Sequence, residues 1–197
     1  MASAEPKTAP TAPNKLRADA RRNRDKLIEV AAAAFAENGV ETSLEDIARQ
    51  AGVGIGTLYR HFPTREHLVE IVYRRELESL AAAARELATK HTPDVALEEW
   101  MRRFVGYIAT KRGMANSLRI LMTSNSSLFA EGFGLIRSAF EGLVKTASDG
   151  NYIRTDIETA DLLQALSSIY SIPDSPDWRE RSHRLIGLLM DGLRTKK

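Results

Sequence analysis

Apolar side chains recur at every third or fourth position along most of this chain, a spacing that predicts amphipathic α-helices. The first helix is expected from about Asp19 to Asn38, and Gly39 favours the left-handed conformation in which such a helix ends. No segment alternates with a period of two between hairpin turns, so we expect no sheet. The pattern predicts an all-α protein, with later helices over residues 65–90, 93–113, 115–122 and 128–148, and from Thr155 and Ser175 onward.

The stretch from Thr42 to Thr64 predicts two short helices joined by a tight turn. Ser43 is a natural N-cap, and Asp46, three residues later, makes a variant of the capping box. Gly52 suits the left-handed end of the first helix. A second helix from Ile55 to Phe62 would bury one side and turn the other outward. This arrangement predicts a helix-turn-helix whose second helix reads DNA.

The same stretch resembles the DNA-binding signature of TetR-family transcriptional repressors. That signature is a Gly-Val corner, then Gly-Thr-Leu-Tyr-x-His-Phe, then a capping residue and a basic-acidic pair; here these are Gly52-Val53, Gly56 to Phe62, Thr64 and Arg65-Glu66. Many members carry a capping residue such as Ser where this chain has Gly54. The resemblance implies phosphate contacts by Tyr59 and His61, and the outward position of Arg60 suits contact with guanine. The full set of expected DNA contacts is Arg21, Arg22, Ser43, Gly54, Gly56, Thr57, Tyr59, Arg60, His61 and Arg65.

A basic segment leads into the first helix. Residues 1–14 are rich in Ala, Pro and Thr and are expected to be disordered, whereas residues 15–26 hold six basic and two acidic side chains. This segment is either an arm that reaches phosphates or a minor groove, or simply a solvated helix face. We therefore divide the chain into a disordered, basic-tailed arm (residues 1–18), a three-helix DNA-binding domain (19–65), and a helical effector-binding and dimerisation domain (66–197).

Aromatic and methionine side chains gather in the C-terminal half. An ordinary helical core would explain each of them singly, and an apolar cavity with a few polar groups is the alternative. This half is similar to the SbtR-like branch of the TetR family. The resemblance implies a pocket for a small-molecule effector that weakens operator binding. The candidate pocket residues are Trp100, Phe104, Tyr107, Met122, Phe129, Phe133 and Tyr170.

The last two predicted helices are apolar on more than one face. Such a helix needs a second partner, either in its own subunit or in another copy. The family resemblance favours a four-helix bundle between two subunits, and reading a palindrome also requires a two-fold pair of recognition helices. The candidate dimer contacts are Leu162, Leu166, Ile169, Leu185, Leu189 and Leu193.

Composition narrows the alternatives only slightly. The chain has no Cys, which excludes disulfide and thiol chemistry, and its net charge of +2 does not by itself indicate DNA. Residues 1–65 hold 10 Lys and Arg against 8 Asp and Glu, and residues 66–197 hold 18 of each kind, so the excess lies in the helix-turn-helix half. Apolar runs are too short for a bilayer and no signal-peptide pattern precedes the first helix, so we expect a cytoplasmic protein with no membrane partner.

The sequence lacks the usual signatures of an enzyme. The four histidines (His61, His67, His91 and His183) show no metal-ligand spacing, and there is no phosphate-binding loop or nucleophile elbow. We expect no catalytic residue, metal or cofactor. The chain is interpreted as a DNA-binding regulator, most simply a homodimeric repressor that binds a double-stranded operator and that a small apolar ligand releases. A regulator without an effector and a helical-bundle enzyme are the alternatives.

Overall fold

The computed structural model describes residues 12–173 and 175–195 of the chain. In this part of the chain the elements are helical and there is no strand, which confirms the predicted all-α class; one isolated antiparallel bridge joins Ile153 to Arg194. None of the helices described is long and apolar enough to cross a membrane. The elements are α1 (Ala12–Asn38), η1 (Gly39–Glu41), α2 (Leu44–Ala51), α3 (Ile55–His61), α4 (Arg65–Lys90), α5 (Pro93–Gly113), α6 (Ala115–Ser124), α7 (Ser126–Asp149), α8 (Thr159–Ser167), η2 (Ser168–Ser171) and α9 (Trp178–Leu193).

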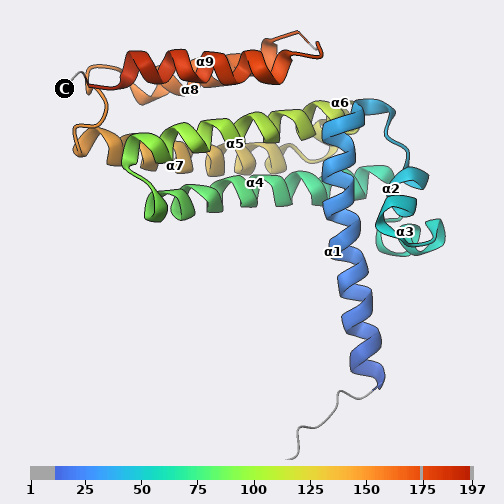
Figure 1. Ribbon diagram of the computed structural model, residues 1–197. Helices are drawn as coiled ribbons and strands as arrows, with labels where there is room; N and C mark the ends of the chain where they lie inside the picture. Colours follow the sequence, from blue (N-terminus) through green and yellow to red (C-terminus); the bar gives the residue numbers. More distant parts are fainter. Residues whose placement is uncertain (1–11, 174, 196–197) are drawn as a thin grey trace, which may run out of the picture.

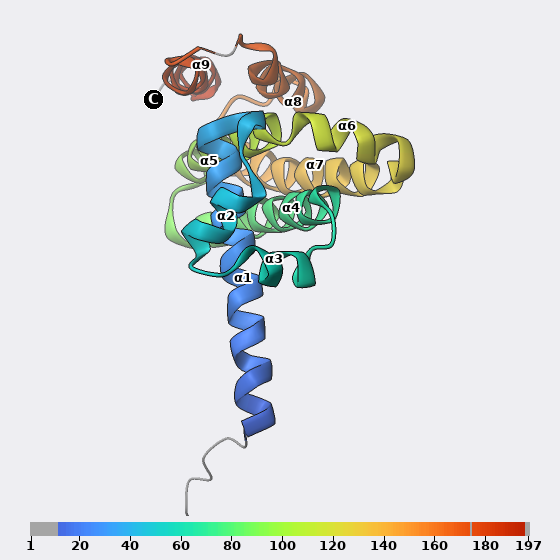
Figure 2. The same cartoon turned by 90° about the vertical axis from the view of Figure 1, so that its right-hand side faces the viewer.

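The helices form a small head and a larger body. The head consists of α1, α2 and α3, and the body of α4 to α9 (Figure 1). In the body, α4, α5 and α7 run alongside one another, while α8 and α9 form a separate layer over them. Seen after a quarter turn, α3 lies at the edge of the molecule from which α1 extends (Figure 2). The exposed side of α3 and the free end of α1 therefore lie at the same end of the molecule.

The helix-turn-helix forms through the caps and the packing that its sequence predicts. The Ser43 hydroxyl oxygen accepts a 3.0 Å hydrogen bond from the Asp46 N–H and donates one of 2.8 Å to the Asp46 carboxylate. Gly52 ends α2 with a φ of 72°, in the left-handed region that glycine enters without strain. Leu58 and Phe62 are fully buried, so α3 is anchored by its inner side and its outer side is left open.

The first helix begins earlier than the sequence led us to expect. It starts at Ala12, so residues 12–18, which we assigned to a disordered arm, are helical. Alanine and arginine favour helix without any tertiary contact, and this propensity extends α1 beyond its buried part. Residues 1–11, the rest of the predicted arm, lie outside the described residues. The predicted stripe on α1 is buried at Leu27, Ala31, Ala34 and Phe35 and half-buried at Val30.

The long helix α4 belongs to both parts of the molecule. It begins at a cap in which the Thr64 hydroxyl oxygen accepts a 3.1 Å hydrogen bond from the His67 N–H. With 26 residues it is about 39 Å long. Its buried side chains run from Leu68 to Leu87, so the first turns pack on the head and the later turns on α5 and α7. The predicted bounds of this helix are confirmed.

The head is also attached to the body where α1 ends. A Cβ atom on Gly113, the last residue of α5, would lie 1.9 Å from the carbonyl oxygen of Phe35, so only glycine allows α1 and α5 to approach this closely. The next carbonyl, that of Ala36, accepts a 2.8 Å hydrogen bond from Arg179 of α9. The C-terminal end of α1 is therefore held by two helices of the body.

The connection between α6 and α7 is shorter than predicted. Residues 123–127 were expected to form a loop, but α6 continues to Ser124 and α7 starts at Ser126. The single residue between them, Asn125, accepts a 3.4 Å hydrogen bond from the Leu128 N–H. This side-chain cap starts α7 at once, so a longer loop is not needed.

The last two helices also begin later than predicted. Thr155 was expected to cap a helix with Glu158, but α8 begins at Thr159 and no side chain caps it. Likewise α9 begins at Trp178 and not at Ser175. The chain before α8 is instead fixed by the bridge between Ile153 and Arg194, a contact between distant segments that overrides the local capping pattern.

Polar contacts fasten the outer layer to α5. Arg194, just after α9, lies 3.0 Å from the Asp94 carboxylate and 2.8 Å from the Glu98 carboxylate near the start of α5. At the other end of α5, Arg112 donates hydrogen bonds of 3.2, 2.7 and 2.6 Å to the carbonyls of Ile169, Tyr170 and Ile172. The layer of α8 and α9 is thus held at both ends of one helix.

Candidate nucleic-acid interface and ligand cavity

The outer side of α3 presents hydrogen-bond donors to solvent. Tyr59 is 44% exposed and Arg60 is also exposed, while Thr57 and His61 are half-buried beside them. A Cβ atom on Gly56 would meet nothing within 4 Å, so the start of α3 is open to close approach. A phenol O–H, a guanidinium and an imidazole on the solvent side of a helix are groups that can contact DNA phosphates and base edges.

Two predicted DNA contacts are engaged inside the head. Ser43 makes both of its capping hydrogen bonds with Asp46. Arg65 donates a 2.6 Å hydrogen bond to the carbonyl of Thr42, and its guanidinium carbon lies 5.2 Å from the centre of the Phe35 ring. These two side chains hold α2 and the start of α4 in place. A contact between either of them and DNA stays a prediction.

The basic side chains of α1 differ in their surroundings. Arg24 lies over the Phe62 ring, 5.6 Å from its centre, and so packs against the end of the helix-turn-helix. Arg21 and Arg22 are exposed, and Arg22 pairs with Asp19 on the preceding turn. Arg24 of α1 contacts Phe62, the residue that follows α3. Arg21 and Arg22 precede Arg24 by up to one helical turn and so lie nearer to the N-terminal end of α1.

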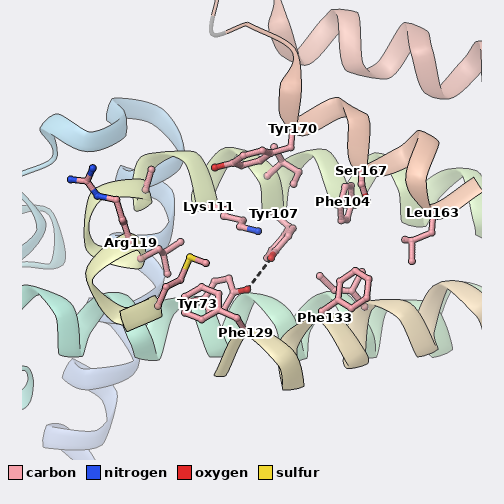
Figure 3. Close-up of a pocket in the computed structure, with 15 residues that line it drawn as sticks. Tyr73, Phe104, Tyr107, Lys111, Arg119, Phe129, Phe133, Leu163, Ser167 and Tyr170 are labelled. Carbon is pink, nitrogen blue, oxygen red and sulfur yellow. Dashed lines mark hydrogen bonds between the residues drawn. The ribbon is translucent and has the colours of Figure 1, made fainter. Parts of the chain in front are cut away.

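The body contains a cavity of about 570 Å³ between α4, α5, α6, α7 and the segment from α8 to η2 (Figure 3). This volume lies within the range of roughly 300–1,000 Å³ that is usual for small-molecule sites. Its wall is mostly aromatic and aliphatic. Six of the predicted pocket residues line it, namely Phe104, Tyr107, Met122, Phe129, Phe133 and Tyr170.

Several polar groups lie within this mostly apolar wall, among them two phenols and a lysine. The Tyr107 and Tyr73 hydroxyls form a 3.3 Å hydrogen bond, and burial raises the pKa of both phenols, so both are neutral at physiological pH. The Lys111 ammonium lies 5.3 Å from the centre of the Tyr170 ring and 5.9 Å from that of Tyr107. Burial lowers the pKa of Lys111. The cavity therefore offers hydrogen-bond donors and a cation to whatever occupies it.

Trp100, the seventh predicted pocket residue, does not line the cavity. It is fully buried, its indole N–H donates a 2.8 Å hydrogen bond to the Leu80 carbonyl, and its ring packs against Phe104 and Phe140. It belongs to the core behind the cavity wall. Conversely, the prediction missed other cavity residues, among them Tyr73, Lys111, Leu118, Arg119, Leu163 and Ser167.

Known proteins match both halves of the chain. Residues 92–195, just over half of its length, match the family model of the C-terminal domain of SbtR-like transcriptional regulators. Residues 27–72 match the model of bacterial regulatory proteins of the tetR family. This chain belongs to the TetR family of transcriptional regulators. The predicted family resemblance, including the SbtR-like C-terminal half, is confirmed.

Individual relatives agree with this assignment over most of the chain. A TetR transcriptional regulator from Streptomyces coelicolor is 41% identical, with 88% of this chain and 99% of that chain aligned and a TM-score of 0.78. A TetR regulator from Mycobacterium vanbaalenii is 31% identical over 91% of this chain and 99% of that chain, with a TM-score of 0.71. An HTH-type transcriptional regulator from Staphylococcus aureus is 30% identical over 159 residues, 78% of this chain and 82% of its own. This TetR-family protein is thus a DNA-binding regulator.

The predicted dimer contacts of this TetR-family protein fall into two groups. Leu162, Leu166, Ile169 and Leu193 are buried within the subunit, so α8 and α9 already cover one apolar face. Leu185 is 41% exposed, Leu189 is half-buried, and Leu188, outside the predicted set, is 69% exposed. These three leucines lie within one turn of α9 and make an apolar surface that the described part of the subunit leaves open.

Proposed function

We propose that this TetR-family regulator is a cytoplasmic repressor that binds a palindromic operator as a homodimer. We further propose that a small, largely apolar molecule in the cavity releases it from DNA. The observation that carries the DNA-binding part is the open face of α3. There, Tyr59 and Arg60 project from a short helix that Leu58 and Phe62 anchor in the core. A rigid helix with donors on its free side is the usual means of reading the major groove.

The exposed leucines of α9 support the homodimer. Leu185 and Leu188 are three residues apart and so share one face of the helix. An exposed apolar stripe on a helix marks an interaction surface, and the commonest symmetric solution is a two-fold dimer. A two-fold pair can place the two α3 helices about 34 Å apart, one turn of DNA, as half-sites of a palindrome require.

The shared helix α4 supports the release mechanism. Tyr73, on the third turn of α4, lines the cavity, while the first turns of the same helix pack on the head. A ligand changes DNA affinity only if it binds two arrangements of the protein with different affinity. Because α4 contacts both the cavity and the head, it is the element through which such a difference can reach α3.

The DNA-binding part is tested with the intergenic DNA upstream of the gene that encodes this chain. Fluorescence anisotropy should give saturable binding, and footprinting should protect two half-sites about one helical turn apart. The absence of preferential binding over random duplex DNA of equal length would contradict the proposal and would favour the helical-bundle enzyme. A palindrome that loses affinity when one half-site is scrambled supports a dimer.

The dimer is tested by charge substitution on α9. Leu188→Glu should convert the protein to a monomer in mass photometry, because a carboxylate at the centre of an apolar interface loses its hydration. Ile120→Glu on α6 is the matched control, since Ile120 is also exposed, at 54%, and lies outside the proposed interface. Dissociation by both variants, or by neither, would contradict the assignment to α9.

The effector is tested separately from DNA binding. Candidate apolar molecules are added to the preformed operator complex, and release is followed by anisotropy. If operator binding is specific but unaffected by any molecule that fills the cavity, the alternative of a regulator without an effector replaces this part of the proposal.

A further inference from the structure

The charged side chains that line the cavity are of one sign; Glu76, the carboxylate that acts on Tyr107, lies outside the lining. The lining includes two cations, Lys111 and Arg119, and no aspartate or glutamate among the residues that the structure describes. In Figure 3 the Lys111 ammonium lies beside Tyr107 within the cavity, whereas the Arg119 guanidinium points away from it. Lys111 is half-buried and Arg119 is exposed. The cation that an occupant would meet inside the cavity is therefore Lys111.

Lys111 has no carboxylate partner in the described ranges, 12–173 and 175–195. No ion pair involves it there, and its ammonium instead lies over the faces of the Tyr107 and Tyr170 rings. Aromatic faces attract an ammonium ion but replace only part of its lost hydration. Burial accordingly lowers the pKa of Lys111. An anion that entered the cavity would gain from this cation, and a second cation would be repelled by it.

A second donor lies close to this ammonium. The Tyr73 and Tyr107 hydroxyls carry two hydrogens, and their mutual 3.3 Å hydrogen bond uses one of them. Among the described residues the other hydrogen has no acceptor. The Ser167 hydroxyl, on α8, also lines the cavity. A carboxylate has two oxygens and accepts several hydrogen bonds, so it suits an ammonium with an adjacent phenol.

We propose that the ligand of this cavity is an apolar organic acid, with its carboxylate paired to the Lys111 ammonium and its hydrocarbon part against the aromatic wall. This inference rests on the proposed function, because it names the chemical class of the effector. Phe104, Phe129 and Phe133 supply the apolar surface that gives affinity, and Lys111 supplies the preference for an acid over a neutral or cationic molecule of the same shape.

The test uses three probes with the same chain and different head groups: decanoate, decanol and decylammonium. Isothermal titration near neutral pH measures each with the full-length wild-type protein, with Lys111→Met and with Lys111→Arg. The wild type should prefer decanoate to decanol by about 10- to 100-fold, as expected of a charge-assisted hydrogen bond. Lys111→Met should remove this preference and leave decanol binding within about twofold, and Lys111→Arg should keep part of it.

The controls distinguish an effect of Lys111 in the cavity from the general effect of removing a positive charge from the protein. Lys145→Met removes an exposed lysine of α7 that pairs with Asp149, and it should change none of the three affinities. Thermal melting establishes that each variant is folded. Equal affinity for decanoate and decanol, a preference for decylammonium, or no binding of any probe would overturn the proposal, and so would an unchanged preference in Lys111→Met. Operator binding by the same samples is measured apart, so failure of the acid preference leaves the DNA-binding function to be judged by its own result.

Discussion

At the scale of single residues, the contacts proposed for Tyr59 and Arg60 are of two kinds, one with phosphate and one with a base. Tyr59→Phe should weaken binding to all sequences alike, by about 0.5–1.5 kcal/mol per half-site, because it removes one hydrogen bond to phosphate. Arg60→Ala should cost about 1–3 kcal/mol per half-site and relax the preference at one base position. Anisotropy with the operator and with single-base variants measures both effects. Unchanged affinity in both mutants would remove these residues from the interface.

Two glycines make a matched pair for stability. Gly113→Ala would place a Cβ 1.9 Å from the Phe35 carbonyl oxygen and should destabilise the protein by about 1–3 kcal/mol, because α1 and α5 must move apart. Gly142, inside α7, has open space around its Cβ position, so Gly142→Ala should instead stabilise the protein by up to about 1 kcal/mol. Denaturant unfolding compares them. A similar effect in both would mean that the contact at Gly113 does not limit the approach of the helices.

The residues of the cavity show what periodicity can and cannot predict. Phe104 and Tyr107 line the cavity, and their spacing puts them on one side of α5. Trp100 has the same spacing, one turn before Phe104. It lies in the core, however, where its indole N–H donates a hydrogen bond to the Leu80 carbonyl. Lys111 lies four residues after Tyr107 on the same side of α5. From the sequence alone, however, a lysine is expected to be exposed to solvent, so it was not predicted to line a cavity. Spacing predicts on which side of a helix a residue lies. Whether that residue reaches the core or the cavity depends on the helix packed against it.

At the scale of elements, the contact between α9 and α5 has a predictable pH dependence. Burial opposes the charged forms of Asp94 and Glu98, but hydrogen bonds from Arg194, together with Thr92 for Asp94 and Arg102 for Glu98, outweigh it and lower both pKa values. Carboxylates with lowered pKa values stabilise the folded state above their ordinary pKa of about 4, and this contribution is lost as the pH falls through their folded values.

Arg194→Met should therefore reduce the free energy of unfolding by about 1–2 kcal/mol at neutral pH and by less near pH 3. The control is Arg137→Met, whose partner Glu141 lies 2.7 Å away on an exposed face of α7 and whose removal should change little at either pH. Urea unfolding at the two pH values gives the comparison. An effect of Arg194→Met that is independent of pH would exclude the carboxylates as its cause.

The free end of α1 is tested through the salt dependence of operator binding. If Arg21 and Arg22 bind phosphates, replacing both with Gln should reduce the slope of log affinity against log salt by about 0.9 for each phosphate that is no longer neutralised. Arg24→Gln should act on head stability as well, since Arg24 packs on Phe62. Arg85→Gln with Arg137→Gln, both exposed on the body, is the charge-matched control. An identical slope in the double variant of α1 would mean that its charges are merely solvated.

Capping patterns predicted some helix ends and not others. The Ser43 and Thr64 caps form as expected, because each lies next to a short turn whose geometry is local. Thr155 and Glu158 have the same pattern, yet the preceding segment pairs at Ile153 with Arg194, and the cap does not form. Whether such a cap forms depends on contacts between distant segments, and these contacts cannot be predicted from the local sequence.

At the scale of the whole molecule, ligand and operator must affect each other equally. Phe104→Ala enlarges the cavity behind which Trp100 packs, so it should spare operator binding and alter the response to the effector. If an acid such as decanoate lowers operator affinity by some factor, the operator must lower acid affinity by the same factor. Titrating decanoate into free protein and into the operator complex measures this factor. Equal acid affinity in the two would exclude ligand regulation through the cavity.

The crossing at Gly113 has a mechanical consequence for the head. Two regions hold the head on the body: the end of α1, held at Phe35 and Ala36, and the start of α4. A rigid body that is held at two points can still rotate about the line that joins them. Since α6 follows Gly113 after one residue and lines the cavity, one of these fixed points lies next to the cavity. A shift of α6 would move this fixed point and tilt the line, and the resulting displacement of the head would grow with distance from the body, toward α3.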